Sequence, residues 1–262
     1  MAYRKKFWFL PFAPRFARRK WLYRTHVKLK VKIKRQRERV TPMTNAPLIN
    51  SKVQYPDSDG QPMADNTQQF RWIVFIKENL ELLFANDANV FVAGDLLWYP
   101  VQGSPEICVA PDVMVALDRP KGDRGSYQQW LENNIAPQVV FEILSPGNRM
   151  KEMTKKLQFY DNYGVEEYYI YDPERNDLHG LYRQNQRLNV IEDVGNWVSP
   201  RLQIRFALND ETFEIYRPDG QKFLTTLELS QKLEQERQRA EQEYQRAEKL
   251  LAQLLALGVN PE

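Results

Sequence analysis

The chain is poor in the residues that form disulfides and histidine-rich metal sites. Cys108 is the single cysteine, and His26 and His179 are the only histidines among 262 residues. One cysteine excludes a disulfide within the chain and favours a reducing compartment, so we expect a cytoplasmic protein. Two histidines argue against a histidine-rich zinc site. No apolar run approaches the length of a membrane span, so we expect a protein that does not enter the bilayer.

Acidic residues are almost missing from the first forty positions, where 15 lysines and arginines accompany only Glu38. Residues 41–262 reverse the balance, with 22 basic and 33 acidic residues. An acidic body disfavours non-specific binding to nucleic acid, because phosphate neutralisation supplies most of that affinity. The composition changes abruptly before Met43. We therefore interpret residues 1–42 as a basic leader, disordered or upstream of the natural start, with a nucleic-acid-binding arm as the alternative.

The body reads as short elements separated by turn residues. Apolar residues at helical spacing predict a helix over 66–86 and a second from about 149 to 162, which Gly164 ends. Runs rich in β-branched and aromatic residues predict strands. Their expected ranges are 90–99, 107–117, 138–144, 167–171, 178–183, 188–192, 202–206 and 212–216.

The C-terminal region, residues 225–262, is charged and is expected to form a helix. Leucine, alanine, tyrosine and arginine recur there at alternating steps of three and four residues, which is a heptad register. Arginine and tyrosine are poor residues for the seam of a coiled coil. Two interpretations stay open, a solvated helix and a tail that pairs two copies of the chain into a homodimer.

Two carboxylates stand inside stretches that otherwise read as buried strands. Asp112 precedes the apolar run 113–117, and Glu142 lies within the run 139–144. A buried carboxylate is costly unless a cation or strong donors compensate it. Adjacent strands can bring both acids to one edge of a sheet, where the backbone carbonyl of Ile143 would add a third oxygen. Magnesium accepts such a donor set, and manganese is the alternative.

Two lysines follow this pair in the chain, in the helix that comes after the next turn. Lys156 and its neighbour Lys155 lie in the predicted second helix, about 100° apart around its axis, so only one of them can face the acids. An amine there would orient a water or stabilise charge in a transition state. A bound divalent cation lowers the pKa of water and polarises a phosphoryl oxygen. The set therefore points to hydrolysis of phosphodiesters, whereas the absence of a Walker loop argues against an ATPase.

The order of these residues resembles the Uma-two family, which comprises restriction-endonuclease-like proteins of bacteria within the PD-(D/E)xK nuclease superfamily. The resemblance spans roughly residues 50–220. It rests on Pro111-Asp112, on Val140-Phe141-Glu142-Ile143-Leu144-Ser145-Pro146, on Lys156-Leu157-x-x-Tyr160-x-x-x-Gly164-Val165-x-Glu167-Tyr168, and on Asp172-Pro173.

The resemblance implies an α/β fold of the α+β type, with a mixed sheet flanked by helices, a restriction-endonuclease-like domain over 43–224, and DNA as the substrate. It implies a metal held by Asp112 and Glu142. The usual Glu-x-Lys of the superfamily would place lysine at 144, where this chain has leucine. In the Uma-two pattern the lysine comes from the following helix, which here matches Lys156.

Each feature also has a simpler interpretation. Asp112 would be an ordinary turn residue, Glu142 an edge residue facing water, and Glu152 with Lys156 an ion pair on a helix surface. The first hypothesis for the whole chain is a metal-dependent endonuclease. The second is an inert protein of nuclease fold that binds DNA or another partner, and the third is an enzyme acting on RNA, single strands or nucleotides.

Overall fold

The computed structural model describes residues 53–147, 150–210 and 212–257, so the expectations for residues 1–42 lie outside the described residues. Within these ranges, no helix combines the length and the apolar character needed to cross a membrane. The helices are α1 (Thr67–Leu83), α2 (Met150–Tyr163), α3 (Thr226–Ala256) and the short 3-10 turns η1 (Gln129–Leu131) and η2 (Val194–Asn196).

A mixed six-stranded sheet forms the centre of the domain, in the order β1-β3-β5-β6-β7-β8. Among the neighbouring strands of this sheet only β5 and β6 run parallel, and α2 forms the crossover between them. Two further two-stranded sheets pair β9 with β10 and β2 with β4. The strands are β1 (Val90–Gly94), β2 (Trp98–Tyr99), β3 (Val113–Leu117), β4 (Tyr127–Gln128), β5 (Val139–Ile143), β6 (Glu167–Asp172), β7 (Asp177–Gln184), β8 (Arg187–Val190), β9 (Arg205–Leu208) and β10 (Phe213–Tyr216).

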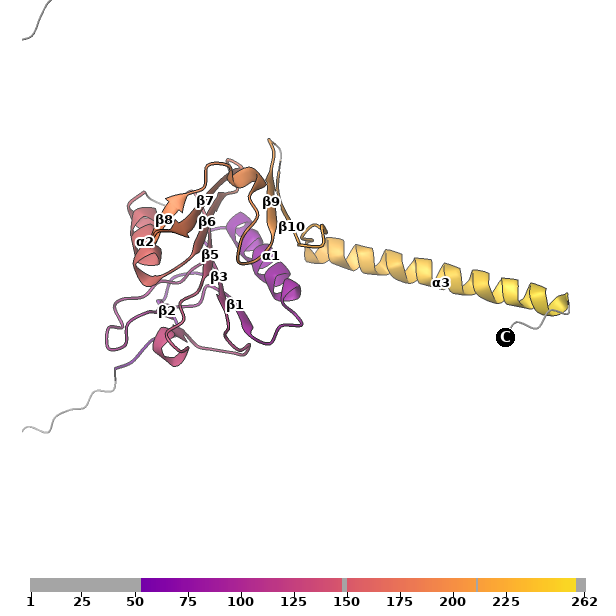
Figure 1. Ribbon diagram of the computed structural model, residues 1–262, viewed down its shortest axis with the longest axis horizontal. Coiled ribbons are helices and arrows are strands. Elements are labelled where there is room, and N and C mark those ends of the chain that lie inside the picture. The colour runs from indigo at the N-terminus through magenta and orange to yellow at the C-terminus, as the bar shows by residue number, and fades with distance from the viewer. Residues whose placement is uncertain (1–52, 148–149, 211, 258–262) are drawn as a thin grey trace, which may run out of the picture. The chain divides into compact units, whose positions relative to one another are not determined.

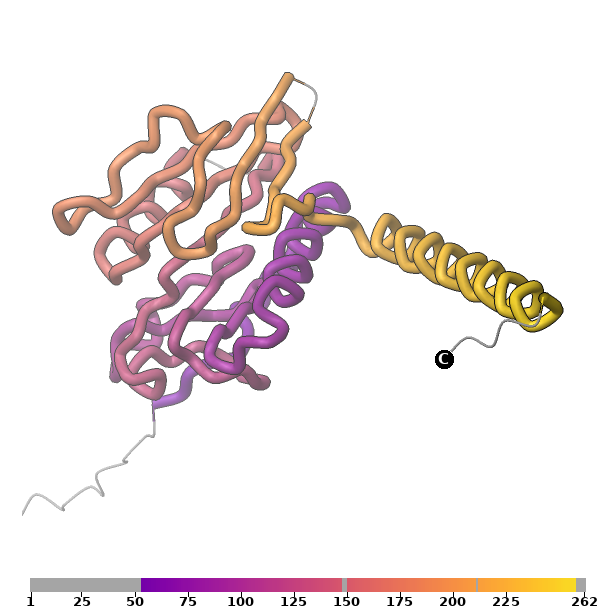
Figure 2. Tube along the Cα trace, turned by 45° about the vertical axis from the view of Figure 1, so that its right-hand side comes forward, coloured from indigo at the N-terminus to yellow at the C-terminus, as the bar shows by residue number. Residues whose placement is uncertain are grey.

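The central sheet is covered on both faces, so successive side chains of β5, which point to opposite faces, are all buried. Figure 1 shows α1 on one side of the sheet and α2 on the other, and in Figure 2 the β9–β10 hairpin lies alongside α1. One buried cluster joins α1, the hairpin and alternate sheet residues, among them Val139 and Phe141. The opposite cluster joins Val140 to the α2 residue Tyr160. The predicted mixed α/β fold is confirmed.

Several predicted strands differ in length from the observed ones. The expected strand over 90–99 breaks at Asp95, whose φ of 49° is left-handed and ends the extended conformation. The expected strand over 107–117 is regular only from Val113, because Pro111 has no N–H for the ladder. The strand expected at 202–206 begins at Arg205 instead. Gly164, with a φ of 95°, follows the last residue of α2 as predicted.

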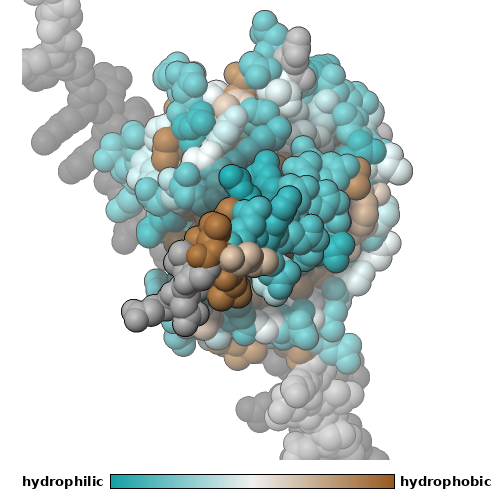
Figure 3. All heavy atoms as spheres, turned by 90° about the vertical axis from the view of Figure 1, so that its right-hand side faces the viewer, coloured by the Kyte–Doolittle hydropathy of each residue, from teal (hydrophilic) through white to brown (hydrophobic). Residues whose placement is uncertain are grey.

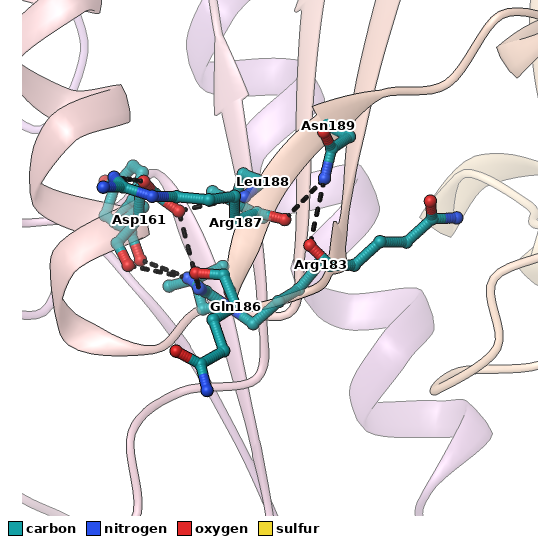
Figure 4. Close-up of polar contacts among 9 residues, drawn as sticks. Asp161, Arg183, Gln186, Arg187, Leu188 and Asn189 are labelled. Atoms are coloured by element: carbon teal, nitrogen blue, oxygen red, sulfur yellow. Dashed lines mark hydrogen bonds and ion pairs between the residues drawn. The ribbon is translucent and has the colours of Figure 1, made fainter.

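The position of α2 depends on an arginine from the β7–β8 hairpin. The last carbonyls of a helix lack partners within it. Arg183 donates to the carbonyls of Asp161 at 2.8 Å, Tyr160 at 3.3 Å and Val165 at 2.7 Å. Figure 4 shows Arg183 and Arg187 reaching toward Asp161 at this end of α2. The hairpin therefore fixes the helix that carries Lys156.

We expect Arg183→Ala to lower the free energy of unfolding by about 2–3 kcal/mol, because buried carbonyls lose charged donors. Arg187 is the matched control. Its side chain is 74% exposed and its main contact is an ion pair with Asp161, so Arg187→Ala should cost less than about 1 kcal/mol. Urea denaturation of both variants measures the difference. Equal losses would contradict the capping role of Arg183.

Candidate metal centre

The two predicted carboxylates lie side by side at one edge of the sheet. Asp112 directly precedes β3 and Glu142 lies in the neighbouring strand β5. Both are buried, with 8% and 3% of their surfaces exposed. Asp112 Oδ2 accepts a hydrogen bond of 2.6 Å from the backbone N–H of Ile143, the residue after Glu142. The two strands are thus joined at the point where the acids stand.

Lys156 supplies the cation at this edge. Its ammonium Nζ lies 2.6 Å from Oε2 of Glu142, and its side chain is 19% exposed. Burial lowers the pKa of Lys156, but the charges of Glu142 and Asp112 outweigh burial and leave the pKa raised. Lys156 is therefore a cation at neutral pH. Lys155 is exposed and makes no ion pair with any described residue, so the helix presents one of its two lysines to the acids.

The charge of the site depends on whether Asp112 carries a proton. Burial and the nearby charge of Glu142 raise the pKa of Asp112 to about 8, against the opposing effects of Lys156 and the Ile143 N–H. At neutral pH the metal-free site therefore keeps Asp112 largely protonated, and Lys156 balances the charge of Glu142. A divalent cation would favour the ionised form of Asp112, and the donor set fits magnesium, which needs only one or two carboxylates. In the described ranges, no group of three or more acidic, cysteine or histidine side chains could hold a metal by itself.

The carbonyl of Ile143, expected as a third oxygen, already has one partner. Gln69 of α1 donates its Nε2 to this oxygen at 2.9 Å, and the Gln69 side chain is buried. A carbonyl oxygen has two lone pairs, so the contact orients it without using its full capacity. In turn Gln69 is held by Asp65, whose backbone N–H donates to Gln69 Oε1 at 2.8 Å.

A cleft of about 490 Å³ opens beside these groups. Asp112 and Lys156 line it, whereas Glu142 does not. Glu142 lies behind its partners, since its second oxygen, Oε1, accepts a hydrogen bond of 2.5 Å from the hydroxyl of Tyr160. The other charged residues of the wall are mostly acidic, and they are Asp59, Asp65, Asp95, Glu152 and Lys155.

The chain matches a known protein family over most of its length. A family model described as "Uma2: Putative restriction endonuclease" matches residues 47–245. The chain belongs to the Uma2 family. Among solved structures it is similar to "a putative nuclease belonging to DUF820" from Anabaena variabilis, with 16% identity and a TM-score of 0.39, over 53% of this chain and 74% of that one. No curated protein matches the chain.

Membership of Uma2 confirms the resemblance that the residue order indicated, and the structure adds how position 144 is used. Leu144 lines a separate cleft with Met150 and Met153, while its backbone N–H bonds to the carbonyl of Tyr171 at 2.8 Å. Strand β5 itself carries no lysine. Lys156 approaches Glu142 from α2 instead.

Three residues of this Uma2 chain lie at the site without having been predicted there. Tyr160 stands in the family pattern but had no assigned role, although its spacing of four from Lys156 places both on one face of α2. Gln69 had no sequence signal, because its partner is a backbone carbonyl 74 residues away. Asp95 also lines the cleft, at the break between β1 and β2.

Proposed function

We propose that the protein is a metal-dependent endonuclease that hydrolyses phosphodiester bonds of DNA through a PD-(D/E)xK-type site. Asp112, Glu142 and the carbonyl of Ile143 would hold Mg²⁺, or Mn²⁺ in its place. The observation that carries the proposal is the meeting of two buried acids from adjacent strands with one partly buried amine. Membership of a family described as restriction endonucleases supports it.

When bound, the cation would lower the pKa of a coordinated water and polarise the phosphoryl oxygen. The chain's own residues supply the remaining functions. Asp112 and Glu142 orient their oxygens through the Ile143 N–H and the Tyr160 hydroxyl. Lys156 stays protonated, so it acts as a donor and a positive charge toward phosphate, and not as a base.

Plasmid cleavage tests the proposal directly. We expect purified protein to nick or linearise supercoiled plasmid in the presence of Mg²⁺ or Mn²⁺. Addition of EDTA should stop the cleavage. A parallel panel of RNA, single-stranded DNA and mononucleotides separates an endodeoxyribonuclease from an enzyme with another phosphodiester substrate. Cleavage that continues unchanged in EDTA would overturn the metal dependence.

One observation favours the alternative of an inert nuclease-fold protein that binds DNA or another partner. The cleft wall is acidic, which opposes the approach of phosphate. Calorimetric titration with Mg²⁺ decides between the two, because the inert protein would not need to bind the ion. Absence of binding in wild-type protein would favour the alternative.

The C-terminal helix supports a proposal about assembly. All described residues of α3 are exposed, and it buries none of its apolar side chains. Figure 3 shows hydrophobic residues gathered at the end of α3. They are Leu250, Leu251, Leu254, Leu255 and Leu257. Upstream, glutamates such as Glu236 and Glu241 flank the heptad seam and would repel a parallel copy. We propose that two chains pair through the leucine-rich end.

Light scattering after gel filtration checks this assembly. We expect full-length protein to be a dimer and Leu251→Glu to be a monomer, because a charge enters the apolar contact. Leu227→Glu is the matched control, since Leu227 is an exposed leucine at the other end of the same helix. A wild-type monomer, or dimers in both variants, would contradict pairing through this end.

A further inference from the structure

The ring of Tyr160 is held rigidly between the sheet and the helix that carries it. It is fully buried. It stacks on Trp98 with ring centres 6.4 Å apart and planes at 3°, and meets Tyr168 edge-on at 4.9 Å. The ring of Phe159, its neighbour in α2, also packs edge-on against it, with ring centres 6.0 Å apart. Tight packing of this kind allows one rotamer, so the hydroxyl has a fixed position.

That position is used to bind Glu142. The Tyr160 hydroxyl donates to Oε1 at 2.5 Å while Lys156 contacts Oε2 at 2.6 Å. Lys156 and Tyr160 lie four residues apart on α2 and therefore share one face of the helix. Because each oxygen has its own partner, the carboxylate cannot rotate without breaking a contact. A buried charge makes both contacts strong.

A second tyrosine shows that burial alone does not create such a contact. Tyr168 is as buried as Tyr160 and packs against it, from strand β6. Among the described residues, its hydroxyl is the only buried side-chain polar atom without a hydrogen-bond partner. The two neighbouring hydroxyls therefore differ in one respect, the bond to Glu142.

We propose that Tyr160 is a positioning residue: its hydroxyl fixes Glu142 through Oε1 and leaves Oε2 as the oxygen that Lys156 and a divalent cation share. The inference rests on the proposed function, since it concerns the ligand that Glu142 would supply. It gives the helix two tasks at the site. Lys156 brings the charge, and Tyr160 sets the direction in which the carboxylate faces.

Calorimetric titration of the full-length protein with Mn²⁺ tests this role. We expect Tyr160→Phe to weaken Mn²⁺ affinity by about 10–100-fold, the usual effect of losing a partner that orients a metal ligand. Tyr168→Phe removes an equally buried hydroxyl that has no hydrogen-bond partner. The Mn²⁺ affinity of this variant should therefore stay within about twofold of wild type. Thermal unfolding of each variant establishes that it is folded.

A donor-retaining variant keeps the test decisive if Tyr160→Phe does not fold. Replacing Tyr160 by 4-aminophenylalanine keeps an N–H donor at the same place, and we expect affinity between wild type and the phenylalanine variant. Equal affinities of Tyr160→Phe and Tyr168→Phe would overturn the inference. If the phenylalanine variant does not fold, a loss of about tenfold or more with 4-aminophenylalanine, which keeps the donor, would overturn it. Failure of wild-type protein to bind Mn²⁺ would overturn the proposed function, and the inference with it.

Discussion

Glu142→Gln protein is expected to remain folded and to lose at least about three orders of magnitude in plasmid cleavage. An uncharged amide is a poor metal ligand, and loss of the several kcal/mol that a metal supplies to a phosphoryl transition state corresponds to such a factor. Folding should persist because the amide can keep both contacts. Its oxygen accepts from Lys156, and its NH₂ donates to the Tyr160 hydroxyl, which can also accept.

The control for this substitution lies at the rim of the same cleft. Glu152 lines the cleft from the first turn of α2 and is exposed. Glu152→Gln removes one negative charge from the wall without touching Lys156's partner, so we expect cleavage within about threefold of wild type. If the Glu142→Gln protein cleaves plasmid as fast as the Glu152→Gln protein, the assignment of Glu142 to the active site is wrong. The assay is the rate of conversion of supercoiled to nicked plasmid.

Lys156→Met is expected to reduce cleavage by about 10²–10⁴-fold, because the transition state loses a fixed positive charge. The change also leaves two buried acids without their cation. Removing one partner of a buried ion pair costs about 3–5 kcal/mol of stability, less where Asp112 keeps its proton. Magnesium affinity should be retained, since the competitor for Oε2 of Glu142 is gone.

Lys155→Met provides the comparison, because it changes the neighbouring residue on the same helix. Lys155 is exposed, and we expect its loss to alter cleavage and stability only slightly. Cleavage rates, urea denaturation and calorimetry on both variants separate a role in charge stabilisation from one in metal binding. The assignment of the amine to Lys156 fails if Lys155→Met is the more damaging substitution.

The sequence allowed the sheet and the meeting of the acids to be predicted, because both depend on local patterns. Glu142 is the one acid in a run whose other residues are apolar, and this run became a fully buried strand. Asp112 was placed correctly next to it, since consecutive strands commonly pair. The distance along the chain between β5 and α2 left Lys155 and Lys156 as candidates, and the resemblance to the Uma2 pattern selected Lys156.

What could not be predicted depends on contacts between distant parts of the chain. Gln69 reaches Ile143 across the domain, and Arg183 caps a helix from a hairpin that follows it. Neither contact has a spacing that a sequence pattern would reveal. The break at Asp95 was missed for a different reason, because the apolar residues on either side extended the predicted strand across Gly94-Asp95, although aspartate adopts the left-handed conformation more readily than most residues.

The amine of Lys156 has a consequence for how the protein matures. Because it already neutralises the carboxylate of Glu142, the polypeptide carries its own counterion and does not need a metal ion to complete folding. Zinc fingers behave in the opposite way and unfold when the ion is withdrawn. Under the proposed function, a chelator should therefore stop cleavage reversibly and leave a folded molecule that regains activity when the ion is returned.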